Sequence, residues 1–282
     1  MNRTAALGLS LLAALTIASI LAPLATSIEI LDSPFSMDLK RRLLPPGAEN
    51  LMGTDELGRD VLARILHGSR TSLLVAFVAT GVALAIGVPA GALAGARGGL
   101  WDLILTRLME ATAGLPALPI LLLVVSLTLG GESGEGAAAL IVLAGAIGIT
   151  RWAAIARYVR GGVWRAQVEE YATAALALGA SRSRLLFRHL LPGALAPAMV
   201  SAAFGAGSAV LLESALSFLG LGTQAPSPSW GKMVAAAVAE PGAWWLLVAP
   251  GASIAVLVLG FNLLAEGIRL RDRAPDGWSR PD

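Results

Sequence analysis

Six long apolar stretches alternate with shorter polar ones along this chain of 282 residues. A helix needs about 20 mostly apolar residues to cross the roughly 30 Å hydrocarbon core of a membrane. The stretches that qualify, or nearly qualify, are Leu7–Ile28, Ser72–Ala96, Leu103–Leu129, Ala137 to about Ile155, Ala194–Leu219 and Trp244–Leu264. The pattern therefore predicts an all-α, polytopic membrane protein with six transmembrane helices.

The first stretch has two interpretations. It is uncharged and follows Arg3, so it could be a cleaved signal peptide. Its apolar run exceeds the roughly 7 to 15 residues of a signal peptide, and no clean small-x-small cleavage site follows. We therefore expect a retained anchor helix.

Two further stretches carry local signals. Gly87, Gly91 and Gly95 stand four residues apart in the second, which predicts a flat stripe where another helix packs closely. The third is less apolar in its first half, which contains Arg107 and Glu110 and then Pro116 and Pro119. At a spacing of three residues, we expect Arg107 and Glu110 to form an ion pair at a helix entrance.

Composition supports the membrane assignment and excludes other classes. The chain is 56% hydrophobic and 14% charged, with a mean hydropathy of +0.72, whereas soluble domains carry roughly 25% charged residues. It has no cysteine and only His67 and His189, so we expect no metal site. A nucleic-acid partner would need basic residues interleaved with aromatic ones on a soluble surface, and we expect none.

Charge placement predicts the orientation. With a cytoplasmic N-terminus, most of the 21 Lys and Arg residues fall in cytoplasmic loops, and Arg151 is counted among them. The segment Glu29–Arg70 is an exception, but it is long and its acids balance its bases. We expect both termini on the cytoplasmic side, with the loop 157–192 cytoplasmic as well.

That loop contains EYATAALALGASRSRLLFRHLLP, residues 170–192. A narrow stripe of mostly small residues recurs at i, i+3, i+4 and i+7 of a short helix: Tyr171, Ala174, Ala175 and Leu178. Gly179 should end this helix in a left-handed conformation, and Ser181 should cap the next one.

The second short helix should point Leu185, Leu186 and His189 inward, with Arg182, Arg184 and Arg188 around them. Pro192 should mark the start of the fifth span. An amphipathic helix lying on lipid headgroups is the alternative for the whole loop. Alanines stand where such a helix would need large apolar side chains, which favours a protein groove.

Several of these residues resemble a known family. The pattern ATAALALGAS followed by HLLP is similar to the EAA loop of ABC-importer permeases, through Ala174, Ala175, Gly179, Leu191 and Pro192. Thr173 and His189 depart from it, since the family has an acidic residue and an isoleucine there. Residues 52–77, MGTDELGRDVLARILHGSRTSLLVAF, and 211–233, LLESALSFLGLGTQAPSPSWGKM, resemble the C-type permeases of dipeptide, oligopeptide and nickel importers. The resemblance covers about Gly53 to Arg271.

The resemblance implies a type I ABC-importer permease fold in a bacterial inner membrane. It implies a transmembrane anchor at 1–28, a periplasmic loop with an amphipathic segment at 29–70, the permease domain at 71–271 with its coupling loop at 157–192, and a cytoplasmic tail at 272–282. The residues implied to contact an ATPase are Tyr171, Thr173, Ala174, Ala175, Leu178, Gly179, Ala180, Ser181, Arg188, His189, Leu191 and Pro192.

The implied partners are a second homologous permease, two ABC ATPase subunits, a periplasmic or lipid-anchored solute-binding protein, and membrane lipid. ATP and Mg would be bound by the ATPase subunits, so no cofactor is expected in this chain. No G-x-x-x-x-G-K-[ST] run occurs and no catalytic set of residues falls in one loop, so we expect a non-catalytic subunit. Peptides are the first expected cargo, and nickel chelates or other small solutes are alternatives.

Glu213 is an ionisable residue inside the fifth span, where such groups usually face the interior or a cavity. It is a candidate pathway residue, and a hydrogen-bonded contact between helices is the alternative that we favour. Two other classes remain for the whole chain. A secondary transporter or channel driven by an ion gradient would be expected to show internal repeats, which we do not detect. A receptor-like membrane scaffold would bind partners and move nothing.

Overall fold

The computed structural model of this protein describes residues 3–27, 32–129, 137–223 and 227–272. The elements in chain order are α1 (Arg3–Ser27), a 3₁₀ turn (Leu39–Arg41), α2 (Val61–Arg97), α3 (Gly99–Gly114), α4 (Ala117–Leu129), α5 (Ala137–Gln167), α6 (Glu170–Ala177), α7 (Arg182–Leu185), a π turn (Leu186–Leu190), α8 (Leu191–Phe218), α9 (Trp230–Ala239) and α10 (Trp245–Asp272). Within the described ranges, β structure is limited to one isolated bridge between Thr54 and Asp60. The all-α prediction is confirmed.

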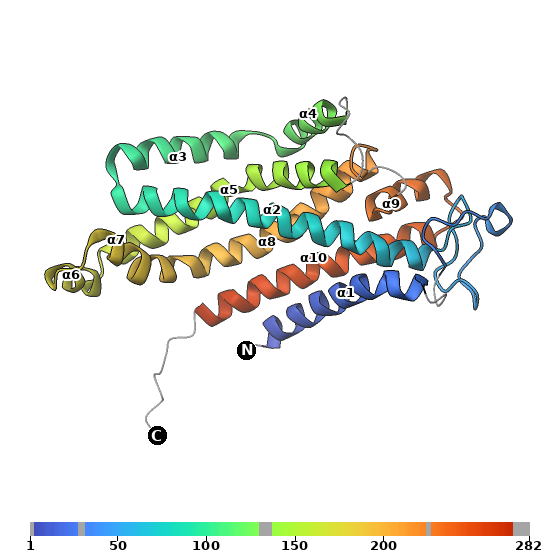
Figure 1. Ribbon diagram of the computed structural model, residues 1–282, viewed down its shortest axis with the longest axis horizontal. Coiled ribbons are helices and arrows are strands. Elements are labelled where there is room, and N and C mark those ends of the chain that lie inside the picture. Colours follow the sequence, from blue (N-terminus) through green and yellow to red (C-terminus); the bar gives the residue numbers. More distant parts are fainter. Residues whose placement is uncertain (1–2, 28–31, 130–136, 224–226, 273–282) are drawn as a thin grey trace, which may run out of the picture.

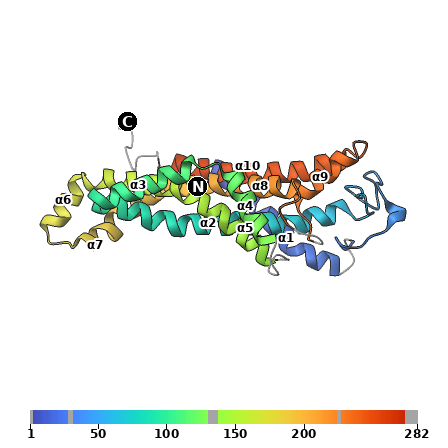
Figure 2. The same ribbon diagram turned by 90° about the horizontal axis from the view of Figure 1, so that it is seen from above.

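The long helices lie side by side in an elongated bundle (Figures 1 and 2). The short helices α6 and α7 lie at one end of the bundle, which we call the α6 end. The segment 32–60 and helix α9 lie at the opposite end, which we call the α9 end. The chain thus places its two largest interhelical segments at opposite ends.

The third predicted span is broken. By length and composition, five helices among the described residues can cross a membrane, and α3 with α4 make a sixth span only as a pair bent by 84°. Leu115, just before Pro116, has an extended backbone with ψ of 130°. A residue before proline is disfavoured in the α conformation, which ends α3 there.

Helix α2 begins earlier than predicted, at Val61 instead of Ser72. The side chain of Asp60 accepts a hydrogen bond of 2.7 Å from the backbone N–H of Ala63 and caps the helix. Charged residues in this first part had indicated a loop, but Arg64 is buried beside Asp55, with 3.4 Å between its Nε and Oδ2. Part of the segment 29–70 is therefore helical.

Two other boundaries are also wrong. Helix α5 continues to Gln167, so residues 157–167 belong to it and not to a loop. At the other side of the hairpin, α7, the π turn and α8 form one continuous helical run from Arg182 to Phe218. Pro192 lies inside this run, at the start of α8 and two residues after the π turn, and the helix continues past it.

The predicted glycine stripe packs closely, as expected. A Cβ atom built on Gly87 would lie 2.8 Å from the carbonyl oxygen of Trp152, and one on Gly95 would lie 2.9 Å from that of Arg160. Gly91 meets the carbonyl oxygen of Ala156 more closely still. The backbones of α2 and α5 approach each other along this line because no side chain separates them.

Helix α1 packs in a similar way against α10. A Cβ on Gly8 would lie 2.9 Å from the carbonyl oxygen of Gly260, and one on Gly260 would lie 3.0 Å from a methyl of Leu12. Ala5 stands equally close to Gly267. This packing favours the anchor interpretation of the first stretch.

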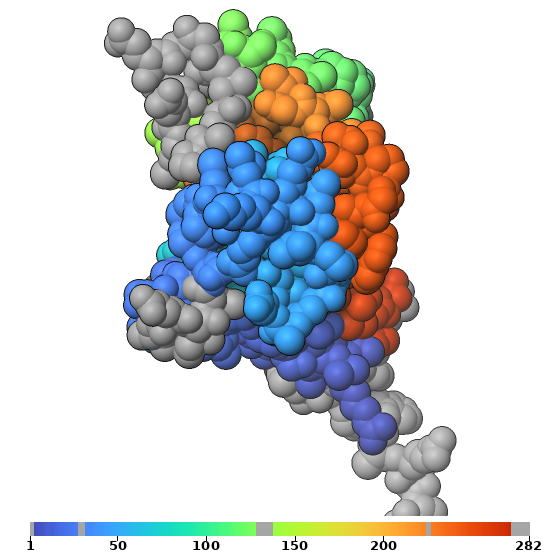
Figure 3. All heavy atoms as spheres, turned by 90° about the vertical axis from the view of Figure 1, so that its right-hand side faces the viewer, coloured from blue at the N-terminus to red at the C-terminus, as the bar shows by residue number. Residues whose placement is uncertain are grey.

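At the α9 end, segment 32–60 covers much of the molecule and α9 lies beside it (Figure 3). Helix α9 lies in a segment that the sequence had indicated as a loop. The indole N–H of Trp230 donates to the carbonyl of Ile65 at 2.9 Å, and that of Trp245 donates to the carbonyl of Thr54 at 3.0 Å. Burial, and then the positive charge of Arg64, lower the pKa of Lys232 on α9. The two indole hydrogen bonds fix α9 to the start of α2 and segment 32–60 to the start of α10.

Candidate functional site

The α6–α7 hairpin has the turn and the cap that the sequence predicted. Gly179 has a φ of +87°, in the left-handed region, and its N–H donates to the carbonyl of Leu176 at 3.0 Å. The hydroxyl of Ser181 accepts a hydrogen bond of 3.3 Å from the N–H of Arg184. The chain therefore turns sharply between two helical segments.

One side of the hairpin is anchored in the bundle. Ala172, Leu185 and Leu190 are buried in an apolar cluster that includes Val163 of α5 and Ala194 of α8. A Cβ on Gly162 would lie 2.7 Å from the Cβ of Ala194, so α5 and α8 cross in close contact just beneath the hairpin. The hairpin is therefore held by the helices that carry it.

The opposite side of the hairpin is free. Tyr171, Ala174 and Leu178 are exposed, and Leu178 keeps 90% of its surface accessible. We call these three residues the free face of α6. Ala175, predicted on the same stripe, is instead partly buried against the apolar cluster. An exposed leucine beside an alanine and a tyrosine is a surface suited to contact with another protein.

His189 does not point inward as predicted. Its side chain is exposed, and Leu190 is buried in its place. In the π turn, the N–H of Leu191 donates to the carbonyl of Leu186, five residues earlier. This wider turn rotates the residues that follow, so a count based on 3.6 residues per turn fails here.

The remaining predicted contact residues lie around the hairpin. Thr173 is exposed, and its hydroxyl donates to the carbonyl of Glu170 at 2.8 Å. Arg188 and Pro192 are exposed, while Ala180 and Leu191 are partly buried. The structure thus brings all twelve predicted residues into one hairpin and the first turn of α8, although they do not share one face.

A groove of about 1050 Å³ runs between the hairpin and the ends of α2 and α3. Its walls include Leu176, Leu186 and Phe187 on one side and Trp101 on the other. The side-chain amide of Gln167 closes one part by donating to the carbonyl of Gly95 at 2.7 Å. The end of α5, from which the hairpin extends, is therefore fastened to α2.

Glu213 is fully buried in a nest of hydroxyl groups. Ser217 donates to Oε1 at 2.7 Å, Ser229 at 3.0 Å and Thr223 at 3.4 Å. The hydroxyl of Ser214 lies 3.5 Å from Oε2. This arrangement holds the end of α8 to the segment before α9, and it favours a hydrogen-bonded contact over a pathway position.

Two charged side chains link α3 to α5. Arg160 pairs with Asp102 through two nitrogen atoms, and the Nη2 to Oδ2 distance is 2.8 Å. Arg107 and Glu110 pair at 2.8 Å on the surface of α3, as the sequence predicted. The first pair attaches the broken span to the rest of the bundle.

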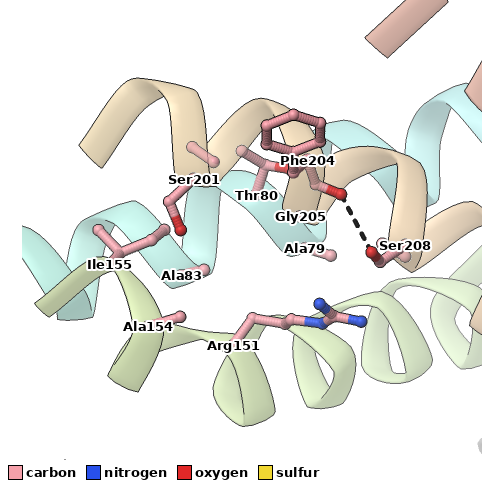
Figure 4. Close-up of a pocket in the computed structure, with 12 residues that line it drawn as sticks. Ala79, Thr80, Ala83, Arg151, Ala154, Ile155, Ser201, Phe204, Gly205 and Ser208 are labelled. Carbon is pink, nitrogen blue, oxygen red and sulfur yellow. Dashed lines mark hydrogen bonds between the residues drawn. The ribbon is translucent and has the colours of Figure 1, made fainter. Parts of the chain in front are cut away.

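Arg151 lies in the middle of α5 and not in a loop, contrary to its place in the charge count. Its side chain lines a cavity of about 140 Å³ between α2, α5 and α8 (Figure 4). The sequence did carry a signal for this position, because Arg151 has apolar runs on both sides. The predicted span to about Ile155 already contained Arg151, and only the charge count placed it in a loop.

The described residues contain no group of three or more His, Asp or Glu side chains that could hold a metal ion. Glu213 is held by hydroxyl groups and Asp102 by an ion pair, whereas the buried hydroxyl of Thr80 has no hydrogen-bond partner among the described residues. The features with the clearest functional geometry are therefore the free face of α6 and the cavity at Arg151.

Comparison with known proteins places these features in context. Residues 87–271 match the family described as "Binding-protein-dependent transport system inner membrane component". The chain is 38% identical to the dipeptide transport system permease protein DppC of Alkalihalophilus pseudofirmus, over 95% of this chain and 84% of that protein. It is 39% identical to the probable D,D-dipeptide transport system permease protein DdpC of Escherichia coli, over 84% of this chain and 77% of that protein.

The oligopeptide transport system permease protein OppC of Bacillus subtilis is 33% identical, over 95% of this chain and 84% of that protein. Among solved structures, a chain of the MetNI methionine ABC transporter in an inward-facing conformation is similar. The TM-score is 0.61 at 17% identity, covering 76% of this chain and 98% of that chain. This likeness shows a shared fold.

Proposed function

Because this chain belongs to the family of binding-protein-dependent transport system inner membrane components, we propose that it carries di- and oligopeptides across a bacterial inner membrane. The chain is a multi-pass permease subunit of an ABC importer with the type I fold. Support for peptides as cargo comes from DppC, DdpC and OppC, since all three are peptide permeases by name and align over most of the chain.

The complete importer, in this proposal, contains a second homologous permease, two ABC ATPase subunits and a solute-binding protein. The ATPase subunits hold ATP and Mg, and this chain supplies part of the pathway and the mechanical contact. Many large apolar side chains on the outside of α1, α3 and α4 are exposed, which suits contact with lipid or with the second permease.

The α6 end is cytoplasmic in this proposal, and the α9 end is periplasmic. Exposed arginines gather in the hairpin of the α6 end, at 182, 184 and 188. Cytoplasmic loops of membrane proteins carry an excess of Lys and Arg. Helices α1 and α10 both extend from the α9 end in the direction of the α6 end, although α1 stops well short of it (Figure 1). In this proposal both termini are therefore cytoplasmic.

The free face of α6 carries the proposal for coupling. Ala172 and Leu185 hold the hairpin to α5 and α8, and the opposite face projects with nothing described packed over it. When a partner pushes on an exposed face whose other side is packed against helices, the displacement passes to those helices. We assign this face to the contact with an ATPase subunit.

The energy source tests the function. The permease, its second permease, both ATPases and the binding protein are reconstituted in vesicles, and uptake of a labelled dipeptide is followed. We expect uptake only with ATP, and inhibition by vanadate. Uptake driven by an ion gradient without ATP would overturn the assignment in favour of a secondary transporter.

The contact itself is tested by Ala174→Trp. An indole on the free face would separate the two surfaces, and loss of about 1.4 kcal/mol or more at such an interface weakens docking at least about tenfold. We expect ATP-dependent uptake to fall by about that factor while the chain still inserts in the membrane. Ala48→Trp is the matched control, since Ala48 is also exposed but lies at the α9 end. Equal uptake in the two variants would contradict the assignment.

A further inference from the structure

We propose that Arg151 binds the terminal carboxylate of a peptide as it passes through the membrane. This inference rests on the proposed peptide transport and adds a residue that contacts the cargo. Arg151 stands in the middle of α5, and its side chain lines the cavity shared with α2 and α8. Figure 4 shows its guanidinium extending from α5 in the direction of Ser208.

Within the described residues, Arg151 has no ionic partner. The ion pairs of the described chain involve other side chains, and none of the described hydrogen bonds comes from the guanidinium of Arg151. Arg160, on the same helix, is by contrast paired with Asp102. An unpaired charge in a membrane-spanning helix is costly and marks a position that faces a partner or a pathway.

The cavity offers the other groups that an anion needs. The hydroxyl of Thr80 is buried and has no hydrogen-bond partner among the described residues. Ser201 stands on the opposite wall in α8. The neighbouring hydroxyl of Ser208 already donates to the carbonyl of Phe204 at 3.1 Å, so Thr80 and Ser201 supply the hydroxyl donors. Hydroxyl donors beside a guanidinium form a site for a small oxyanion.

The shape of the cavity fits the end of a peptide. Small residues, among them Ala79, Ala83 and Gly205, make much of its wall and leave about 140 Å³ empty. A cavity of about that size can hold a benzene ring, so it has room for a terminal carboxylate and the atoms next to it but not for a whole dipeptide. Phe204, which is 42% exposed, also lines the cavity.

The chemistry of the cargo explains why a carboxylate is the ligand of choice. A free peptide of any sequence ends in one carboxylate, whereas its side chains vary. A guanidinium pairs with a carboxylate through two parallel hydrogen bonds, which gives orientation as well as attraction. A contact to this group would hold peptides of many sequences in the same way.

The test compares a dipeptide that has a free C-terminal carboxylate with the same dipeptide as its C-terminal amide. Uptake of both is measured in vesicles that contain the full importer, each at a concentration that saturates the binding protein. The ratio of the two rates in a variant is divided by the ratio in the wild type. Effects of the binding protein cancel in this quotient, because the same binding protein serves the variant and the wild type.

For Arg151→Gln we expect uptake of the free dipeptide to fall on the order of tenfold and that of the amide to change little. Arg151→Lys keeps the charge but loses the two parallel hydrogen bonds, so its ratio should lie between those of wild type and Arg151→Gln. Arg157→Gln is the matched control on the same helix, since Arg157 is exposed and outside the cavity. It should leave the ratio unchanged.

A ratio for Arg151→Gln equal to that of the wild type overturns the inference, whether uptake is normal or both rates fall together. The second result would mean that Arg151 pairs with an acid of the second permease. If Arg151→Gln does not assemble, Thr80→Val removes a hydroxyl from the same cavity and should shift the ratio about two- to threefold. A wild-type importer that moves neither dipeptide would instead refute the proposed function itself.

Discussion

At the scale of single residues, two carboxylates of this protein have hydrogen-bonding partners, whereas Arg151 and the buried hydroxyl of Thr80 have none among the described residues. Glu213 is buried among four hydroxyl groups, and Asp102 is paired with Arg160. The first arrangement satisfies a buried carboxyl group, and the second is an ion pair that stays partly exposed. Arg151 has no such partner in the described chain, and we therefore infer that it pairs with the cargo.

The hydroxyl nest predicts different results for two changes at Glu213. Glu213→Gln keeps an acceptor oxygen for the surrounding hydroxyls, and these can rotate to suit the new amide. Glu213→Ala leaves them without that acceptor and opens a cavity, so we expect a loss of about 2–5 kcal/mol of unfolding free energy. Thermal unfolding of the purified complex measures the difference.

Uptake provides the second readout for Glu213. The Glu213→Gln variant should transport the same set of peptides as the wild type, because the residue is a contact between α8 and the segment before α9. A changed preference among peptides would show that Glu213 meets the cargo after all.

Gly179 carries a prediction about the hairpin. Its φ of +87° is a conformation that costs a residue with a Cβ roughly 1–2 kcal/mol, although no atom would clash with the added methyl. Gly179→Ala should therefore speed amide hydrogen exchange across the hairpin. Gly193→Ala is the control, since Gly193 is helical and also has open space around it. Alanine should slightly stabilise that site, and slower exchange in Gly179→Ala would contradict the prediction.

At the scale of elements, the sequence predicted the order of the long helices but neither the break in the third span nor where the helices begin and end. The apolar runs located each long helix because a span must be apolar over most of its length. The predicted ends of the helices were wrong where a polar residue of a helix has an ionic partner in another segment. Arg64 continues α2 because Asp55 is beside it, and Arg160 continues α5 because Asp102 is beside it. Such partners are distant in the sequence and cannot be read from it.

The hairpin shows the same limit at closer range. Gly179 and Ser181 were predicted correctly because a turn and a cap depend on local chemistry. His189 was not, because a π turn shifts the residues that follow it. Helix α9 was missed because it has only ten residues, too few to span a membrane.

The contact between α2 and α5 predicts which glycines tolerate a side chain. Gly91→Ala would place its Cβ against the carbonyl oxygen of Ala156, and overpacking of this kind costs about 1–3 kcal/mol. We expect a lower unfolding temperature in detergent. Gly81→Ala on the same helix has open space around it and should be neutral or stabilising. Equal changes in unfolding temperature for the two variants would mean that the close contact of α2 with α5 does not contribute to stability.

At the scale of the whole molecule, the two ends of the bundle differ in what they present. The α9 end is covered by segment 32–60 and α9, which tryptophan hydrogen bonds fasten to the helices. The α6 end presents a compact hairpin with a free apolar face. The proposed orientation assigns the first to the binding protein's side and the second to the ATPase side.

The absence of cysteine from the sequence makes this orientation directly testable. Single variants Leu178→Cys and Ala48→Cys each place one exposed thiol, at the α6 end and the α9 end respectively. A maleimide that cannot cross membranes should label Leu178→Cys in inverted vesicles and Ala48→Cys in right-side-out vesicles. The reversed pattern would show that both termini lie outside the cytoplasm.

If the continuous helical run from Arg182 to Phe218 tilted as a rigid body, it would act as a lever with an off-centre fulcrum. Ala194 is packed against Gly162 of α5, where the missing side chain lets the two helices touch, and we take this contact as the fulcrum. At about 1.5 Å per residue, the arm toward the hairpin is about 18 Å long and the arm toward Glu213 and Phe218 about 36 Å. A tilt that moves the hairpin by a given distance would move the far end by about twice as much. The displacement at the α9 end is about twice as large, and the force there is smaller by the same factor. Whatever the far end of α8 moves must therefore offer little resistance.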